Sequence, residues 1–517
     1  MSYARKLYLI MQKLFIISLC LAAIASCGRN ANGESFDASD DLTDVLMLAH
    51  MRRESIIRPG YYQVERLTIG RDSMPSDLFY RLFDNRPRSN IISANDAIYD
   101  VQIFFSVLSG MYGPYIYFGG DEIFFPIRDD IIEVLNTRNF WYVEDFAKLL
   151  RTNISRIVTD LHFDISRISF RGDYVFLTTD RQFIKTEYGF LCKVNNLYVN
   201  DVKLICTPDF YINIDTLFRL SIDERGSNFF HTPVVIMCYS DISHQPIQLN
   251  VIFEDGIKDV IYLEILYEAL PSFDWYTSLN VIRGFPVVTM CGGMGSLYFQ
   301  HANALGEEQE YVKNSIARQF LAFAEQVRDE PVIILDLRNN LGGNTSLPTQ
   351  WLYTLLDEHV PPSYHVLSVL NYYVAIERFG QTGTGDIFDH REYYVPFDDN
   401  HIIHVVPEDK IVSNNQLLIV LTNRYVFSAA EVMVNLMFNV ENTLIVGQNT
   451  GGAMLTTGGA WRMMLPYSGI SFLFSTSILV QPAGHFREGH GIEPDIWVTS
   501  DALQAVLGML ESHLISK

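Results

Sequence analysis

The chain has 517 residues, which is too long for one ordinary hydrophobic core, so two to four domains are expected. Apolar residues make up 48% and charged residues 19%, a composition that excludes a disordered chain. The formal net charge of -22 argues against nucleic acid or anionic lipid as the main partner, and it places no limit on peptide substrates.

The first residues carry the pattern of a processing signal. Basic residues precede an apolar run, 14–24, which is shorter than the roughly 20 residues that cross a bilayer. Small residues then lead to Cys27, and this string resembles the bacterial lipobox, in which the cysteine is lipidated. We therefore expect a lipoprotein signal peptide over 1–26 and a polar, acidic tether over 27–45. The alternative is a buried N-terminal helix or a retained membrane anchor. Export as a bacterial lipoprotein, at the periplasmic face or the outer membrane, follows from the first interpretation.

Three domains are expected after the tether. Apolar residues recur every three or four positions over 94–111 and 128–157, so 46–165 is predicted to be mainly helical. Short apolar runs alternate with turn residues over 166–285, which predicts a β-rich domain. Strands then alternate with helices over 286–517, which predicts an α/β domain with a partly parallel sheet.

Two segments of the β-rich domain, 194–202 and 246–256, loosely resemble the core and the closing strands of a PDZ domain. We therefore expect a degenerate PDZ-like domain there.

The cysteines give no metal site. Cys192, Cys206, Cys238 and Cys291 lack CxxC spacing, and no His, Cys and acidic residues cluster at metal-ligand spacing. Three disulfide pairings and free buried thiols all stay open. No cofactor is expected.

Two strings in the last third could carry chemistry. In the first, 336–343, a buried strand ends and two glycines follow, where the backbone can offer its amides to a ligand. In the second, a buried strand ends and Ser428 opens a helix, beside unpaired amides that favour developing negative charge. Alternatively, Ser428 is only a helix cap, with Glu431 completing a capping box.

Together and in this order, the two strings resemble the tail-specific, or C-terminal processing, serine protease family. The resemblance continues through the Gly-rich string 447–452 and the Gly-Ile-x-Pro-Asp string that ends at Asp495, and it covers roughly 290–500. It implies a protease core of the ClpP/crotonase-like type, with helical and PDZ-like domains upstream.

The family divides by its catalytic base. One branch uses a lysine about 25 residues after the serine, but Ala453 stands at that position and no lysine lies between Ser428 and Lys517. The other branch, which includes the tricorn protease and the secreted chlamydial protease, uses an upstream histidine and a glutamate near the closing motif. Its matching residues here are His162, in an Asp-Leu-His string, and Glu488. The implied triad is Ser428 as nucleophile, His162 as base and Glu488 orienting the imidazole.

Other residues compete for these roles. His301 is the alternative base, and Glu493 is the alternative acid. His485 and His490 flank Glu488 and are expected on the surface of a loop.

The oxyanion donors implied by the resemblance are the backbone amides of Gly342 or Gly343 and of Ala429. The chain departs from the family pattern at Leu161, where many relatives have glycine, and at Phe427, which could crowd the serine.

The resemblance thus implies a serine endopeptidase that cleaves unfolded or C-terminally exposed polypeptides and is held at a membrane by its lipid. A homo-oligomer stays open. The alternatives are a catalytically inactive peptide-binding scaffold of the same fold and an esterase or amidase that uses the same triad.

Overall fold

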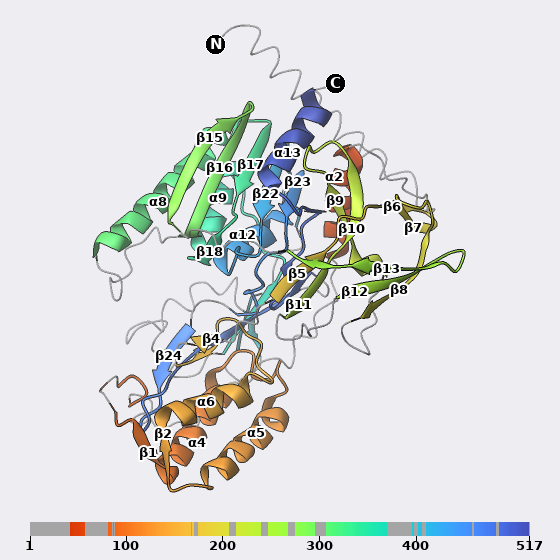
Figure 1. Cartoon of the computed structure of the whole chain (residues 1–517). Coiled ribbons are helices and arrows are strands. Elements are labelled where there is room, and N and C mark those ends of the chain that lie inside the picture. Colours follow the sequence, from red (N-terminus) through yellow and green to blue (C-terminus); the bar gives the residue numbers. More distant parts are fainter. Residues whose placement is uncertain are drawn as a thin grey trace.

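One long mixed sheet, built from distant parts of the chain, forms the centre of the molecule (Figure 1). A helical unit lies on one side of it, and a β-rich region continues from its far end. The predicted α/β class is therefore confirmed. The computed structural model describes residues 42–56, 81–84, 86, 88–166, 168–169, 174–205, 214–238, 247–266, 274–294, 307–369, 395–397, 402–405, 410–456, 460–481 and 485–515.

The central sheet contains a parallel core. Its strand order is β15-β16-β17-β22-β23-β29-β9-β10-β6-β7, with β18 beside β16, and the strands from β16 to β9 run parallel. Every residue of β17, β22 and β23 is buried, as expected for parallel strands covered on both faces. These strands are β15 (Tyr276–Ile282), β16 (Phe285–Met294), β17 (Val332–Asp336), β18 (Asn340–Gly343), β22 (Leu417–Thr422), β23 (Thr443–Gly447) and β29 (Ile496–Trp497).

Helices cover both faces of this core. On one face lie α8 (Glu307–Val327), α9 (Ser346–Leu356) and α12 (Ala429–Met437), and on the other lie α2 (Leu42–Ile56) and α13 (Ala502–Leu510). Because the strands are parallel, the loops that follow β17, β22 and β23 leave the sheet at the same edge, where ligands bind in open α/β sheets.

Helix α2 corrects the predicted tether. Leu42, Val45 and Ala49 are buried against the central sheet, so residues 42–45 belong to the folded protein. Arg53 of the same helix forms a buried ion pair with Asp495, 2.8 Å from nitrogen to oxygen. The predicted signal peptide and the rest of the tether lie outside the described residues.

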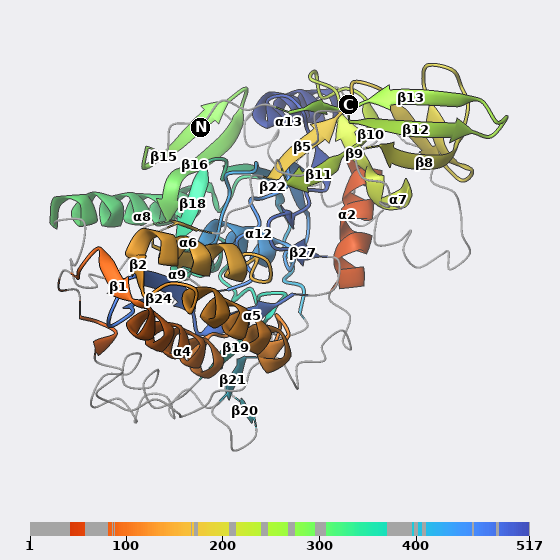
Figure 2. The ribbon, with the colours of Figure 1, turned by 60° about the horizontal axis from the view of Figure 1, so that its bottom comes forward.

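The helical unit contains α4 (Ala94–Met111), α5 (Gly120–Leu135) and α6 (Val143–Ile154). The helical run predicted over 128–157 is wrong, because the polar residues 136–139 end α5 and the short strand β2 (Phe140–Tyr142) precedes α6. The three helices share one core with β24 (Ala460–Met464) and β25 (Ser471–Ser475), which come from the C-terminal third of the chain. Figure 2 shows β24 beside α4 and α6. Helix α2 packs elsewhere, so 46–165 is not one unit.

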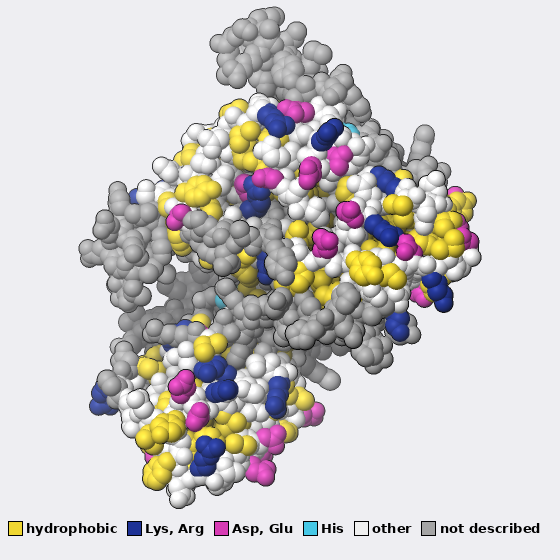
Figure 3. Space-filling view, in the orientation of Figure 1, with side chains coloured by type: hydrophobic (Ala, Val, Ile, Leu, Met, Phe, Trp, Pro, Cys, Tyr) yellow, Lys and Arg dark blue, Asp and Glu magenta, His cyan; other side chains and the backbone are white. Residues whose placement is uncertain are grey.

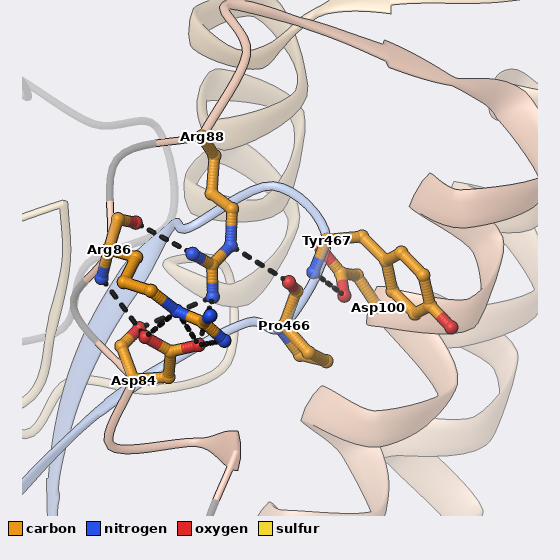
Figure 4. Close-up of polar contacts among 6 residues, drawn as sticks. All are labelled: Asp84, Arg86, Arg88, Asp100, Pro466 and Tyr467. Carbon is orange, nitrogen blue, oxygen red and sulfur yellow. Dashed lines mark hydrogen bonds and ion pairs between the residues drawn. The ribbon is translucent and has the colours of Figure 1, made fainter.

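The turn between β24 and β25 is held from two sides (Figure 4). Arg88 donates to the carbonyl oxygen of Pro466 at 3.0 Å and forms an ion pair with Asp84 at 3.1 Å. On the other side, the buried carboxylate of Asp100 in α4 accepts two backbone amides of the turn, including that of Tyr467 at 3.1 Å. Burial raises the pKa of Asp100 to about 6, although these hydrogen bonds oppose the shift. These contacts connect the helical unit to the C-terminal third.

Strand β25 also places His162. It pairs with β3 (Asp164–Ile165), which begins two residues after the histidine. Asp164 forms an ion pair with Arg462 of β24 at 2.7 Å. The segment carrying His162 is therefore fixed against the C-terminal third, although it follows the helical unit in sequence.

The β-rich region is continuous with the central sheet. Its strand β9 pairs with β29 through Ser221 and Trp497, and β10, β6 and β7 extend the sheet from there. The predicted boundary at 285/286 falls inside the β15–β16 hairpin, so it does not separate two folding units. The strands are β4 (Ile168–Ser169), β5 (Tyr174–Thr178), β6 (Phe183–Thr186), β7 (Gly189–Cys192), β8 (Val199–Ile205), β9 (Phe218–Ile222), β10 (Phe229–Pro233), β11 (Val235–Cys238), β12 (Gln248–Phe253), β13 (Lys258–Tyr262) and β14 (Glu264–Ile265).

Strands β8, β12 and β13 form a separate antiparallel sheet, which contains parts of both segments that resemble a PDZ domain. The PDZ-like character itself stays a prediction.

On the face in Figure 3, acidic and basic side chains of the described residues are scattered rather than gathered by sign. Cys192 and Cys291 are buried free thiols, and Cys206 lies outside the described residues. None of the described helices combines the length and the apolar character needed to cross a bilayer.

Candidate active site

Ser428 sits on a strained turn between strand β22 and helix α12. Its backbone angles are φ 53° and ψ -119°, in a region that side-chain-bearing residues rarely adopt. A residue that only caps a helix takes extended angles instead. A strained residue between a strand and a helix is typical of an exposed nucleophile, and such strain costs about 1–3 kcal/mol. The backbone therefore favours the functional interpretation of Ser428 over the cap.

The buried carboxylate of Glu431 holds this turn in place through hydrogen bonds. Glu431 accepts hydrogen bonds from the Ser428 amide at 3.0 Å and from the hydroxyl of Thr450 at 2.6 Å. It also accepts the amides of Gly452 at 2.9 Å and Ala453 at 2.6 Å. Burial raises the pKa of Glu431 to about 7, and the four hydrogen bonds oppose that shift. Glu431 thus joins the serine turn to the loop after β23, which is more than a capping box requires.

The structure brings His162 to Ser428. The imidazole Nε2 lies 3.2 Å from the serine Oγ, although 266 positions separate the two residues in sequence. This distance is at the long end of hydrogen-bond reach, as is common for a base in a free enzyme. The predicted pair is therefore adjacent in space.

The other side of the imidazole faces a hydroxyl and a second carboxylate. His162 Nδ1 lies 3.2 Å from Thr456 Oγ1, and this hydroxyl donates to Asp160 Oδ1 at 3.0 Å. Asp160 also accepts the backbone amide of His162 at 2.9 Å and the phenol of Tyr112 at 3.0 Å. Burial raises the pKa of Asp160, and the nearby charge of His162 acts in the opposite direction.

Glu488 is buried in the same region and binds backbone amides. One of its oxygens accepts the amide of Leu161 at 2.9 Å, and the other accepts those of Met454 at 3.2 Å and Leu455 at 2.8 Å. Burial and the charge of Asp160 raise its pKa. The carboxylate thus fixes the backbone beside His162 and beside Thr456, whereas the sequence predicted a direct role in orienting the imidazole.

The segment that contains Gly342 and Gly343, called the glycine loop below, lies directly beside the serine. A side chain at Gly342, whose φ is +87°, would meet the carbonyl oxygen of Phe427 and come within 2.8 Å of the Ser428 Cβ and the Ala429 nitrogen. The Gly342 amide donates to the side chain of the buried Asn340 at 3.0 Å, so this amide is engaged. The prediction of Gly342 as an oxyanion donor is therefore corrected.

Two predicted oxyanion donors remain. The amide of Gly343 stays a prediction, and the amide of the next residue, Asn344, donates to the carbonyl oxygen of Met294 in β16 at 3.0 Å. Ala429 is the first residue of α12, and the first amides of a helix have no partner within the helix.

The remaining candidates take other positions. His301 and Cys27 lie outside the described residues. His485, predicted on the surface, is buried against Phe438, and His490 is half-buried. Glu493 forms an ion pair with Arg219 at 2.9 Å.

Phe427 was expected to crowd the serine. Its ring lies against Gly451, where any side chain would collide with it. Glycine at this position therefore makes room for the aromatic ring.

Comparison with known families gives one match. Residues 309–498 match the model of peptidase family S41. The matched range contains the glycine loop, Ser428 and Glu488, and it leaves out His162 and Asp160. The serine peptidase family predicted from the motifs is confirmed over this range. No curated protein sequence matches the chain.

Among the solved structures to which the chain is similar is that of mature CPAF complexed with lactacystin, which is 14% identical. That likeness covers 81% of this chain and 96% of CPAF, with a TM-score of 0.38. The photosystem II D1 C-terminal processing protease is 12% identical over 79% of this chain and 93% of its own, with a TM-score of 0.35. The tricorn protease is 11% identical over 80% of this chain and 35% of its own, with a TM-score of 0.28.

Proposed function

Because the chain carries a domain of peptidase family S41, we propose that it is a serine endopeptidase with Ser428 as nucleophile and His162 as base. The observation that carries the proposal is the 3.2 Å contact between the imidazole Nε2 and the hydroxyl of a serine on a strained turn. A serine hydroxyl is a weak nucleophile unless such a base activates it.

The reaction is acyl transfer in two steps. Ser428 Oγ attacks the peptide carbonyl carbon while His162 Nε2 takes its proton, and the amides of Gly343 and Ala429 stabilise the oxyanion. The imidazolium then protonates the leaving amine, and the peptide C–N bond breaks. Water, deprotonated by the same imidazole, hydrolyses the acyl-enzyme and restores the serine. The buried carboxylates Glu431 and Glu488 keep the participating loops in place.

The proposed substrates are unfolded or C-terminally exposed polypeptides. Peptides that bind as an added strand are recognised through their backbone, which suits loosely specific cleavage. A scaffold without activity would have the same fold, so activity must be measured directly.

The test is covalent labelling of the purified protein with a fluorophosphonate, followed by mass spectrometry of the labelled peptide. We expect one adduct, on Ser428, together with cleavage of casein. An adduct on another serine would overturn the assignment. If neither labelling nor casein cleavage occurs, the inactive scaffold is favoured. Hydrolysis of small esters without casein cleavage would indicate an esterase.

We also propose that the protein is an exported lipoprotein anchored through Cys27, on the basis of the basic start, the short apolar run and the small residues before this cysteine. In bacteria grown with radioactive palmitate, the wild-type protein is expected to take up label and to fractionate with membranes. Cys27→Ala is expected to take up none. Equal labelling of both proteins would contradict the anchor.

A further inference from the structure

We propose that Thr456 and Asp160 are the positioning residues of the base, with the Thr456 hydroxyl fixing the tautomer of His162 and Asp160 fixing the direction of that hydroxyl. This inference rests on the proposed function, because it concerns how His162 serves Ser428. It assigns to an Asp–Thr pair the role that the sequence predicted for Glu488.

The directions of the hydrogen bonds support this assignment. An ionised carboxylate only accepts, so the single proton of the Thr456 hydroxyl points to Asp160. The hydroxyl then presents a lone pair to His162 Nδ1, 3.2 Å away, and the ring must carry its proton on that nitrogen. Nε2 is left as an acceptor for the proton of Ser428. The chain of donors therefore runs from serine to histidine, threonine and aspartate.

Asp160 is held tightly enough to impose this direction. It is fully buried and accepts from three groups: the Thr456 hydroxyl, the Tyr112 phenol and the backbone amide of His162. The last contact ties the carboxylate to the residue that it orients. Its negative charge also interacts electrostatically with His162, and in a buried site such an interaction with the imidazolium formed during attack is only weakly screened.

Glu488 has a different set of contacts. Its two oxygens accept three backbone amides, from the residue before His162 and from the two residues before Thr456. Such a carboxylate determines where the histidine and the threonine stand, but these contacts do not determine which ring nitrogen carries the proton. The two carboxylates are therefore separable by experiment.

The first experiment compares Thr456→Val with Thr456→Ser. Valine keeps the shape of threonine without the hydroxyl, and we expect kcat to fall on the order of 10²-fold with KM nearly unchanged, because only proton transfer is impaired. Serine restores the hydroxyl and should recover most of the activity. Thr232→Val is the matched control, since Thr232 is a buried threonine of β10 that donates to the carbonyl of Thr179 at 3.1 Å.

The second experiment follows the pH dependence of Asp160→Asn. Among the described residues, the ionisable groups around Asp160 are His162, Tyr112 and Glu488, and Glu431 acts on Glu488 in turn. Asparagine lacks the charge that draws the Thr456 proton, so we expect a fall in kcat of roughly 10²–10⁴-fold at high pH. Protonation removes the same charge from the wild type as the pH falls through the Asp160 pKa. The difference between the two proteins should therefore shrink toward acid pH, whereas a merely structural defect would not depend on pH.

The outcomes separate this inference from the proposed function. If wild type reacts with fluorophosphonate at Ser428 and Thr456→Val reacts equally fast, the positioning role is overturned and the proposed function stands. The positioning role would also be overturned if Thr456→Ser had low activity although it unfolded at the same temperature as the wild type. If wild type fails to react at Ser428 and to cleave casein, the proposed function fails first.

Discussion

Replacing Ser428 by alanine is expected to lower kcat for a peptide substrate by about 10⁴-fold or more, because the acyl-enzyme can no longer form. His162→Ala should lower kcat by a similar factor, since the serine would lose the base that lies 3.2 Å away. The double variant should be no worse than either single variant, because the two side chains act as one unit.

Steady-state kinetics with a fluorogenic peptide would measure these three variants, with thermal unfolding as the check on folding. His359→Ala is the matched control for the histidine, since His359 is exposed. If the losses of kcat in the two single variants multiplied in the double variant, the side chains would act independently, which would contradict the proposed pair. A His162→Ala variant with nearly full activity would direct the search for the base to His301.

Gly342→Ala is expected to lower kcat/KM by roughly 10²–10³-fold, comparable with the loss of an oxyanion donor. The added Cβ would meet the carbonyl oxygen of Phe427 and lie 2.8 Å from both the Ser428 Cβ and the Ala429 nitrogen. These atoms belong to the backbone or to the nucleophile, so the clash is relieved only by moving the serine turn or the loop that carries Gly342 away from it.

Gly284→Ala is the matched control for this variant. Gly284 has nearly the same backbone angle, φ +90° against +87°, but nothing lies within 4 Å of its added Cβ. Both variants pay the penalty of an unfavourable backbone angle, and only Gly342→Ala crowds the serine. Comparison of kcat/KM and of thermal unfolding would isolate the crowding. Equal activity of the two variants would mean that the glycine loop is not part of the site.

The sequence predicts the α/β core well, because its signals are local. The buried strand that ends at Asp336 is visible as an apolar run, and in the helical unit the helix over 94–111 is visible as helical periodicity; the structure agrees with both. The predicted tether extends too far because its end depends on distant contacts. Helix α2 begins at Leu42, and it is buried by residues more than 150 positions away in sequence.

The candidate site is predictable only in part. Ser428 and His162 stand in recognisable strings, and they are neighbours in the structure. Asp160 stands in the same Asp-Leu-His string as His162, but the string assigns a role only to the histidine. Thr456 gives no signal at all, because its contact with the imidazole spans 294 positions. The occupied amide of Gly342 depends on a side-chain rotamer of Asn340, which no motif records.

The pairing of β3 with β25 has a consequence for the order in which the molecule becomes functional. Contacts between residues about 300 positions apart require closure of a long loop, and topologies rich in such contacts fold slowly. The base and the nucleophile come together only after both strands exist, so a growing chain would carry an unassembled site until its last third has been synthesised. For the protease proposed here, this connectivity alone would keep the site unassembled while the N-terminal segments of the growing chain are still unfolded.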